Sequence, residues 1–287
     1  MSKTAMVILN HNDNENAKRL VQTVEKCEAI NKIIVADNSL QKDTNLLDII
    51  KSDKTDVIYI ENNGYANGNN AAIENLIKNY GEFDYIIISN PDIIIECESI
   101  TRCIDFLQSN KKYAVVAPHM FSADGKPHHL TGWREKSFLC DLSCSAGILT
   151  RLLGNTHEVY PSEHWNTPFS DTDCVAGSFF VINAEIFAQI GYFDKHTFLY
   201  YEEDIIGVKL KRLGLKSAVL NNCHFTHLEG TSINKSAKIV KRYWMLQRSR
   251  LYFQWHYKKV NVFEYFILIM ATLLGLLQKC IKTILNK

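Results

Sequence analysis

The sequence predicts an α/β fold in which a mostly parallel sheet is flanked by helices. Short apolar runs rich in Ile and Val alternate with stretches of helical periodicity from residue 5 to residue 118. The runs are apolar along their whole length, which is typical of strands that are buried on both faces. Successive strands that are connected by helices form right-handed βαβ units, and such units build a parallel sheet.

The elements of the first half follow in order. Each expected strand is a β-branched or aromatic run that Asn, Asp or Pro closes or closely follows. The expected strands are residues 5–9, 33–36, 57–60, 85–89 and 114–118. The expected helices are residues 15–27, 46–50, 71–80 and 99–108.

The second half is less regular. Residues 119–170 have poor periodicity and are rich in Gly, Pro, His and Trp, which is typical of loops that face a substrate from a rigid scaffold. Strand character resumes at residues 173–182. Asn183 then caps a helix at residues 184–190. A further amphipathic helix ends at Gly214, and the last expected strand is residues 216–220.

Composition excludes some classes of protein. Hydrophobic residues make up 46% and charged residues 22% of the chain, so a normal buried core is expected. The net charge of +1 argues against nucleic acid as the main partner. The eight cysteines are scattered without a Cys-x-x-Cys pair, which disfavours a zinc site. No signal-peptide pattern precedes the first strand, so we expect a cytoplasmic protein with reduced thiols.

Polar residues follow four of the expected parallel strands, and we expect them to lie along one edge of the sheet. They are Asn10, Asp37, the loop 62–70 and Asp92. Amide, carboxylate and backbone N–H groups suit a nucleoside and its phosphates, with the glycine- and asparagine-rich loop leading into a helix N-terminus. This edge has no strong cationic cradle, so a diphosphate would need a divalent cation, for which Asp92 is the expected oxygen ligand. The alternatives are a helix-capping loop at 62–70 and a turn with Asp92 in solvent.

A second group of acids, Glu202, Glu203 and Asp204, begins the amphipathic helix that ends at Gly214. The helix dipole stabilises acids in this position, which is the structural explanation for them. Three in succession after four large apolar residues exceed what a cap needs, so we expect some to face a cleft and one to deprotonate a hydroxyl. A diphosphate leaving group, a metal ion and a base together predict transfer of a sugar.

The C-terminal region from residue 236 has a different character. Lys and Arg alternate with Tyr, Trp and Phe, and residues 263–277 are almost wholly apolar. That run is marginal for crossing a bilayer, which needs about 20 residues. Basic and aromatic residues beside an apolar helix favour an interfacial helix on an anionic leaflet. A helix that packs on the core, or a dimer contact, is the alternative.

Eight segments between residues 4 and 235 carry a resemblance to a known family. They are residues 10–12, 35–39, 62–70, 89–92, 176–178, 191–194 and 198–204, and His227 with Ser232. In this order they resemble the family 2 glycosyltransferases, in the rhamnosyltransferase-like branch of bacterial capsule and O-antigen synthesis. Each segment is modest alone, and the ordered set is specific.

The resemblance implies a GT-A fold in residues 1–235. Residues 1–118 would bind the nucleotide-sugar and residues 119–235 the acceptor, while residues 236–287 would form a helical, membrane-associating extension. The implied reaction is inverting transfer, dependent on Mg²⁺ or Mn²⁺, from a nucleotide-diphosphate sugar to a hydroxyl of a glycan or polyprenyl-linked acceptor. Rhamnose is one candidate sugar. The expected location is the inner face of the cell membrane, with the protein bound peripherally.

The resemblance also implies roles for individual residues. Asp92 would bind the metal, and His227 would help to hold the metal or the diphosphate. The first aspartate of the family's Asp-x-Asp motif is Asn90 here. Glu203 is the first choice for the base, followed by Asp204 and Glu202, and Gly177 would line the acceptor side. Asp37 would contact the nucleobase or ribose, within a donor set of Asn10, Asn12, Asp37, Asn62, Gly64, Gly68, Asn70 and Asn90.

Three other functions compete with this interpretation. A nucleotidyltransferase that acts on sugar phosphates also uses an α/β nucleotide site, but it normally has a glycine-rich loop with Lys or Arg after the first strand, where this chain has asparagines. A nicotinamide dehydrogenase lacks support because no dinucleotide fingerprint follows any strand. A non-catalytic membrane scaffold with a decayed site is the third alternative.

Overall fold

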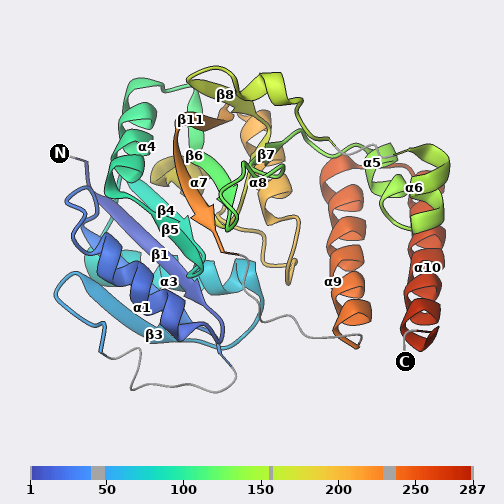
Figure 1. Cartoon of the computed structure of the whole chain (residues 1–287), viewed down its shortest axis with the longest axis horizontal. Coiled ribbons are helices and arrows are strands. Elements are labelled where there is room, and N and C mark those ends of the chain that lie inside the picture. The colour runs from blue at the N-terminus through green and yellow to red at the C-terminus, as the bar shows by residue number, and fades with distance from the viewer. Residues whose placement is uncertain (1, 40–48, 155–157, 229–236, 286–287) are drawn as a thin grey trace.

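A mixed nine-stranded sheet lies at the centre of the computed structural model, which describes residues 2–39, 49–154, 158–228 and 237–285 (Figure 1). The strand order is β3 (Thr55–Tyr59), β2 (Lys32–Asp37), β1 (Thr4–Asn10), β4 (Tyr85–Ser89), β10 (Phe179–Asn183), β6 (Tyr113–Ser122), β11 (Lys216–His227) and β5 (Ile93–Ile95). The remaining strand, β8 (Phe169–Thr172), pairs with β11.

Most of the neighbouring strands in the N-terminal half are parallel, which confirms the predicted fold class. β1 pairs in parallel with β2 and β4, and β2 pairs in parallel with β3. β10 runs antiparallel between β4 and β6, and β11 is parallel to β6. The carboxyl ends of β1, β2 and β4 therefore meet at one edge, as the positions of the polar residues predicted.

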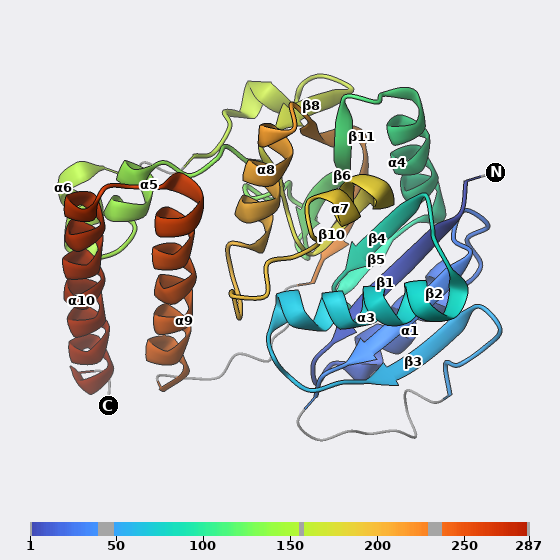
Figure 2. The same cartoon turned by 180° about the vertical axis from the view of Figure 1, so that it is seen from behind.

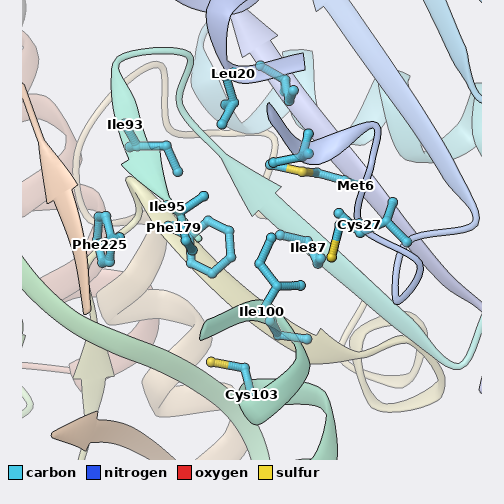
Figure 3. Packing of buried hydrophobic residues seen from close by; sticks show 14 of the residues in the cluster. Met6, Leu20, Cys27, Ile87, Ile93, Ile95, Ile100, Cys103, Phe179 and Phe225 are labelled. Atoms are coloured by element: carbon cyan, nitrogen blue, oxygen red, sulfur yellow. The ribbon is translucent and has the colours of Figure 1, made fainter. Parts of the chain in front are cut away.

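Helices cover both faces of the sheet. α1 (Asn14–Val24) and α4 (Cys97–Ser109) pack on one face, and α3 (Tyr65–Tyr80), α7 (Ala184–Gln189) and α8 (Glu202–Arg212) pack on the other (Figures 1 and 2). Side chains alternate along β1, so Met6 and Ile8 enter the first core while Val7 enters the second. Figure 3 shows the first core, where Met6, Ile87 and Phe179 meet. Each buried side chain of this size contributes about 1.5–3 kcal/mol.

Several expected boundaries were wrong. α3 begins at Tyr65 rather than at residue 71, so most of the asparagine-rich loop is helical. The expected strand 173–182 is broken after β9 (Cys174–Val175), which pairs with β7 (Gly132–Trp133) in a separate two-stranded sheet. β11 extends to His227 because it pairs with β5 beyond residue 220. The expected helix 46–50 falls largely outside the described residues, and its last two residues form a turn.

A helical module stands beside the sheet (Figures 1 and 2). It contains α9 (Ala237–Phe253), a π-helical turn (Gln254–Lys258) and α10 (Val262–Leu285). α5 (Phe138–Ser143) and α6 (Gly147–Leu153), from the region of poor periodicity, pack on α10. The hydroxyl of Tyr243 in α9 lies 2.7 Å from the Ser145 carbonyl and 2.8 Å from the Thr272 carbonyl, which share its one hydrogen, and so it joins the helices. Part of the predicted acceptor half thus packs with the C-terminal extension, whose boundary at residue 236 stays a prediction.

Candidate active site

Asp92 and His227 are brought together by the pairing of β5 with β11. Pro91 ends the β4 segment, and β5 begins directly after Asp92. In the antiparallel register His227 is opposite Ile93, next to Asp92. Nε2 of His227 lies 3.3 Å from Oδ1 of Asp92, and the two side chains are 20% and 14% exposed. An oxygen and an imidazole nitrogen therefore converge at a position that solvent reaches.

Asp37 has one satisfied and one open carboxylate oxygen at the end of β2. Its Oδ1 accepts hydrogen bonds from Asn10 Nδ2 at 2.9 Å and from Ser39 Oγ at 2.5 Å. Its Oδ2 is buried and has no hydrogen-bond partner within the described residues. A buried carboxylate oxygen is costly without a donor, so this atom is suited to a hydroxyl or N–H of a ligand. Asn12, at φ +56°, binds Ser39 Oγ through its backbone N–H at 2.7 Å.

The predicted donor-site glycines and asparagines at the start of α3 pack against the segment 193–201. Gly64 has φ +99°, and a Cβ there would overlap the carbonyl of Phe198. Asn62 Oδ1 accepts from the N–H of Gly64 at 3.3 Å. Asn70 donates to the Phe193 carbonyl at 2.9 Å and accepts from its N–H at 3.2 Å, so both groups of this amide are engaged.

Gly68 lies in the second turn of α3, where a Cβ would come within 2.7 Å of the Leu9 side chain. Its role in the structure is therefore close packing of α3 on β1. Tyr65, which sequence reasoning missed, donates its N–H to the Phe198 carbonyl at 2.8 Å. Its hydroxyl donates to the Gly177 carbonyl at 2.7 Å, so α3 contacts the acid-bearing part of the site directly.

Glu203 lies against the backbone of Gly177. A Cβ at residue 177 would overlap the Glu203 carboxylate, so only glycine fits this position. Burial raises the pKa of Glu203 to about 7, although backbone N–H groups of Glu203 and Gly177 and the Lys136 ammonium act in the opposite direction. A carboxylate that titrates near neutral pH is suited to general base catalysis.

The other two acids have different surroundings. Asp204 is 1% exposed, accepts from Trp133 Nε1 at 3.0 Å and forms an ion pair with Lys136 Nζ at 2.7 Å. Glu202 is 2% exposed. Its burial, and to a lesser extent repulsion from Glu203, raises the pKa of Glu202 well above the usual range. Of the three, Glu203 is the half-buried one. Trp133 and Lys136 were missed because nothing in the sequence between residues 119 and 170 relates them to α8.

The Asp92 and Glu203 parts of the site meet at residues 177 and 178. The N–H of Asn90 donates to the Ser178 carbonyl at 2.8 Å, and β10 then pairs with β4 from Phe179 opposite Ser89. Gly177, which contacts Glu203, is thus one residue from the loop that carries Asp92. The site combines a carboxylate–imidazole pair, an open carboxylate oxygen at the end of β2 and a carboxylate with a raised pKa.

Two curated relatives match this chain over much of its length. It is 27% identical to the rhamnosyltransferase WbbL of Escherichia coli over 269 residues, which is 91% of each chain. It is 28% identical to the low-salt glycan biosynthesis hexosyltransferase Agl10 of Haloferax volcanii, over 69% of this chain and 58% of that protein. No family model matches the chain.

Solved structures support the same fold. A crystal structure of GalNAc-T7 with UDP, GalNAc and Mn²⁺ superposes with a TM-score of 0.62 at 14% identity, over 90% of this chain and 49% of that one. The fold is therefore that of the GT-A glycosyltransferases, and together with the curated relatives it supports a nucleotide-sugar glycosyltransferase. The two curated relatives support a family 2-like glycosyltransferase, which the ordered motifs predicted.

Proposed function

We propose that this glycosyltransferase works by a single inverting displacement in which Glu203 is the base. The carboxylate of Glu203 takes the proton of an acceptor hydroxyl, the hydroxyl oxygen bonds to the anomeric carbon, and the bond from that carbon to the diphosphate breaks. The observation that carries the proposal is the half-buried Glu203 carboxylate against Gly177, one residue from the Asn90–Ser178 hydrogen bond. Asp204 is engaged by Lys136, which makes it the weaker candidate.

We propose that the donor binds along the edge from Asp37 to Asp92. The open Oδ2 of Asp37 supports a contact with the nucleobase or ribose, next to Asn10 and Asn12. Asn62 and Asn90 follow β3 and β4 and are proposed to line the same edge, whereas the engaged amide of Asn70 and the packed Gly68 favour structural roles. Gly64 supports the donor loop through its left-handed φ.

Asp92 and His227 fit a divalent cation such as Mg²⁺ or Mn²⁺. An oxygen and an imidazole nitrogen at 3.3 Å are suitable donors, and both side chains are accessible. Among the described residues no group of three or more His, Cys, Asp and Glu side chains gathers around one position, so diphosphate and water would complete the shell. When bound, such a cation supplies charge stabilisation to the departing diphosphate.

The donor sugar is proposed to be a hexose or deoxyhexose, with rhamnose as the first candidate. Support comes from the relatives, one of which is named as a rhamnosyltransferase and the other as a hexosyltransferase of glycan biosynthesis. The acceptor is proposed to be a glycan or polyprenyl-linked glycan in surface polysaccharide synthesis. Rhamnose transfer to such an acceptor would place the chain in capsule or O-antigen assembly.

We propose that α10 binds the inner face of the cell membrane. The helix has 24 residues, which corresponds to about 36 Å. By length and composition, residues 262–284 could cross a bilayer, and this helix is longer than the apolar run 263–277 that the sequence marked as marginal. Apolar side chains that face solvent include Phe263, Phe266, Leu277 and Ile284 of α10 and Leu152 of α6. Lys279 and Lys282 on the same helix suit an anionic leaflet.

The test of the proposed function is a panel of sugar nucleotides. Purified chain is incubated with UDP-glucose, UDP-galactose, GDP-mannose and dTDP-rhamnose, with Mn²⁺ and a bacterial lipid extract as acceptor source. Release of free nucleoside diphosphate from one donor, and its loss in Glu203→Gln, would support the proposal. A scaffold with a decayed site would release none from any donor, and a nucleotidyltransferase would instead consume nucleoside triphosphate with a sugar phosphate.

A further inference from the structure

A chain of buried polar groups joins α9 to the start of α8. Tyr201, the residue before α8, donates its hydroxyl to Asp141 Oδ1 at 2.5 Å and accepts from Arg250 Nε at 2.9 Å. Gln254 donates to the other oxygen of Asp141 at 2.6 Å. All four side chains are buried. A hydroxyl that is bonded on both sides in a dry environment holds its residue firmly.

The chain continues on the ring of Tyr201. Lys136 Nζ lies 4.2 Å from the centroid of that ring and 2.7 Å from Oδ2 of Asp204. Two cations thus face two carboxylates around one tyrosine, so the buried charges are paired. Asp204 directly follows Glu203 in the first turn of α8, and the network therefore ends beside the proposed base.

The backbone before α8 is strained. Tyr200 and Tyr201 have φ values of +75° and +74°, in the left-handed region that residues with side chains rarely adopt. Such conformations persist where the surrounding structure fixes them, and they are frequent at functional sites. Two residues of α9 fix the backbone conformation of Tyr200 and Tyr201. Ser249 Oγ donates to the Leu199 carbonyl at 2.8 Å, and Arg250 binds the Tyr201 hydroxyl.

The rest of segment 193–201 is held in the same way. Asp194 accepts a hydrogen bond at 2.9 Å from the hydroxyl of Tyr252, at the end of α9. It accepts another at 2.5 Å from the hydroxyl of Tyr257, in the π-helical turn. On its other side the segment bonds α3 through Tyr65 and Asn70. It is therefore clamped between the donor half of the site and the C-terminal helices.

We propose that α9 is a positioning element of the active site, in which Arg250 acts through Tyr201 to fix the first turn of α8 and the carboxylate of Glu203. The C-terminal region then has a second role that does not depend on a membrane. This inference rests on the proposed function, in which Glu203 is the base. Tyr201 and Arg250 are positioning residues, because neither contacts the reacting atoms in this proposal.

The test compares two buried tyrosine hydroxyls. Tyr201→Phe keeps the ring and removes both bonds of the network. Tyr243→Phe is the matched control, because its hydroxyl is also buried but meets only the backbone carbonyls of Ser145 and Thr272. The bond from Arg250 to the Ser145 side chain does not involve this hydroxyl. Turnover is measured with the sugar nucleotide that the panel identifies. We expect kcat to fall about ten- to a hundredfold in Tyr201→Phe at an unchanged donor KM, because a small displacement of the base costs rate rather than binding.

Tyr243→Phe should keep the wild-type kcat and KM, even if both variants unfold at a lower temperature. Wild-type kcat in Tyr201→Phe would overturn the inference, and so would an equal fall of kcat in the two variants. If Tyr201→Phe does not fold, Arg250→Lys makes the same test, since a lysine keeps the charge but cannot bond Tyr201, Ser145 and Gln247 together as Arg250 does.

Two results separate this inference from the proposed function. Loss of turnover in Glu203→Gln with full turnover in Tyr201→Phe overturns the inference alone. Absence of turnover in the wild-type chain with every donor overturns the proposed function, and the inference with it.

Discussion

The carboxylate of Glu203 occupies the space that a side chain at residue 177 would need. This contact joins the start of α8 to the break between β9 and β10. The Tyr65 hydroxyl of α3 also binds Gly177, because it donates to the Gly177 carbonyl at 2.7 Å. Gly177 has no positive φ, so its glycine is explained by close approach rather than by backbone conformation. The position of the proposed base is therefore fixed by a steric relationship that mutation can break.

Gly177→Ala should displace Glu203, so we expect a large fall in kcat with only a modest loss in the free energy of unfolding. The added Cβ overlaps the carboxylate, and overpacking of this kind costs about 1–3 kcal/mol. Gly147→Ala is the control, because the nearest atom to its Cβ is 3.7 Å away at Gln278. Turnover and thermal unfolding of both variants make the comparison, and full activity in Gly177→Ala would contradict the role of this contact.

Activity should rise with pH through about pH 7. Glu203 must be ionised to accept a proton, and burial raises its pKa to about 7, so the acidic limb of kcat/KM reports its ionisation. Glu202 and Asp204 on α8, Lys136, Tyr65 of α3 and Cys174 of β9 are the titratable groups whose charges act around it. If the residual turnover of Glu203→Gln kept the limb at the same pH, the limb would belong to another group.

Removal of the Lys136 charge should move that limb to higher pH. The ammonium lowers the pKa of Glu203, so Lys136→Met makes ionisation of Glu203 harder, and Lys136→Arg preserves the charge. We expect the limb to shift upward in Lys136→Met and to stay near its wild-type position in Lys136→Arg. The pH dependence of kcat/KM for the two variants is the measurement, and equal profiles would exclude an electrostatic effect of Lys136.

The same raised pKa predicts a cost in stability. Between the ordinary pKa of about 4.5 and about 7 the folded state binds more protons than the unfolded state, so the contribution of Glu203 to stability falls as pH rises. Glu203→Gln removes this cost. The variant should therefore gain unfolding temperature relative to wild type at pH 8 but not at pH 4, as active-site residues often trade stability for function.

Local signals in the sequence predicted the sheet, and long-range contacts decided the rest. β1, β2 and β4 are apolar runs that end in polar residues, so their position and burial follow from pattern alone. The start of α3 depends on the bond between the Tyr65 N–H and the Phe198 carbonyl, which no local pattern contains. Likewise, α5 and α6 are short helices that are stabilised by packing on α10. Their apolar periodicity is too short to predict a helix from the sequence.

The candidate site divides in the same way. Asp37 and Asp92 follow strands and were predicted from position, whereas the distinction between Glu202, Glu203 and Asp204 required their neighbours. Lys136, from an irregular segment, engages Asp204 and leaves Glu203 as the accessible acid. Residues that are adjacent in sequence thus differ in chemistry because they face different parts of the fold.

Loss of Asp92 or His227 should weaken the response to a divalent cation. Asp92→Ala should lower turnover at least about a hundredfold, and His227→Ala should raise the Mn²⁺ concentration needed for half-maximal rate. His224→Ala is the control, because His224 lies on the same strand but is exposed and contacts the Phe121 ring. Turnover is titrated with Mn²⁺ after chelation, and an unchanged Mn²⁺ curve in Asp92→Ala would exclude the metal role.

Membrane binding through α10 should depend on the apolar side chains that it exposes. Phe266 and Leu277 are 58% and 57% exposed, and a charge at either position opposes insertion into the interface. The double substitution Phe266→Glu and Leu277→Glu should abolish co-sedimentation with vesicles of phosphatidylglycerol and phosphatidylethanolamine. Ile49→Glu is the control, because Ile49 is also well exposed, at 68%, but does not belong to α10. An anchor on α10 would be contradicted if the double variant still co-sedimented with vesicles. The same conclusion would follow if Ile49→Glu reduced co-sedimentation equally. Turnover of a water-soluble donor should persist in the double variant, since both side chains are more than half exposed and neither takes part in the hydrogen bond between Arg250 and Tyr201.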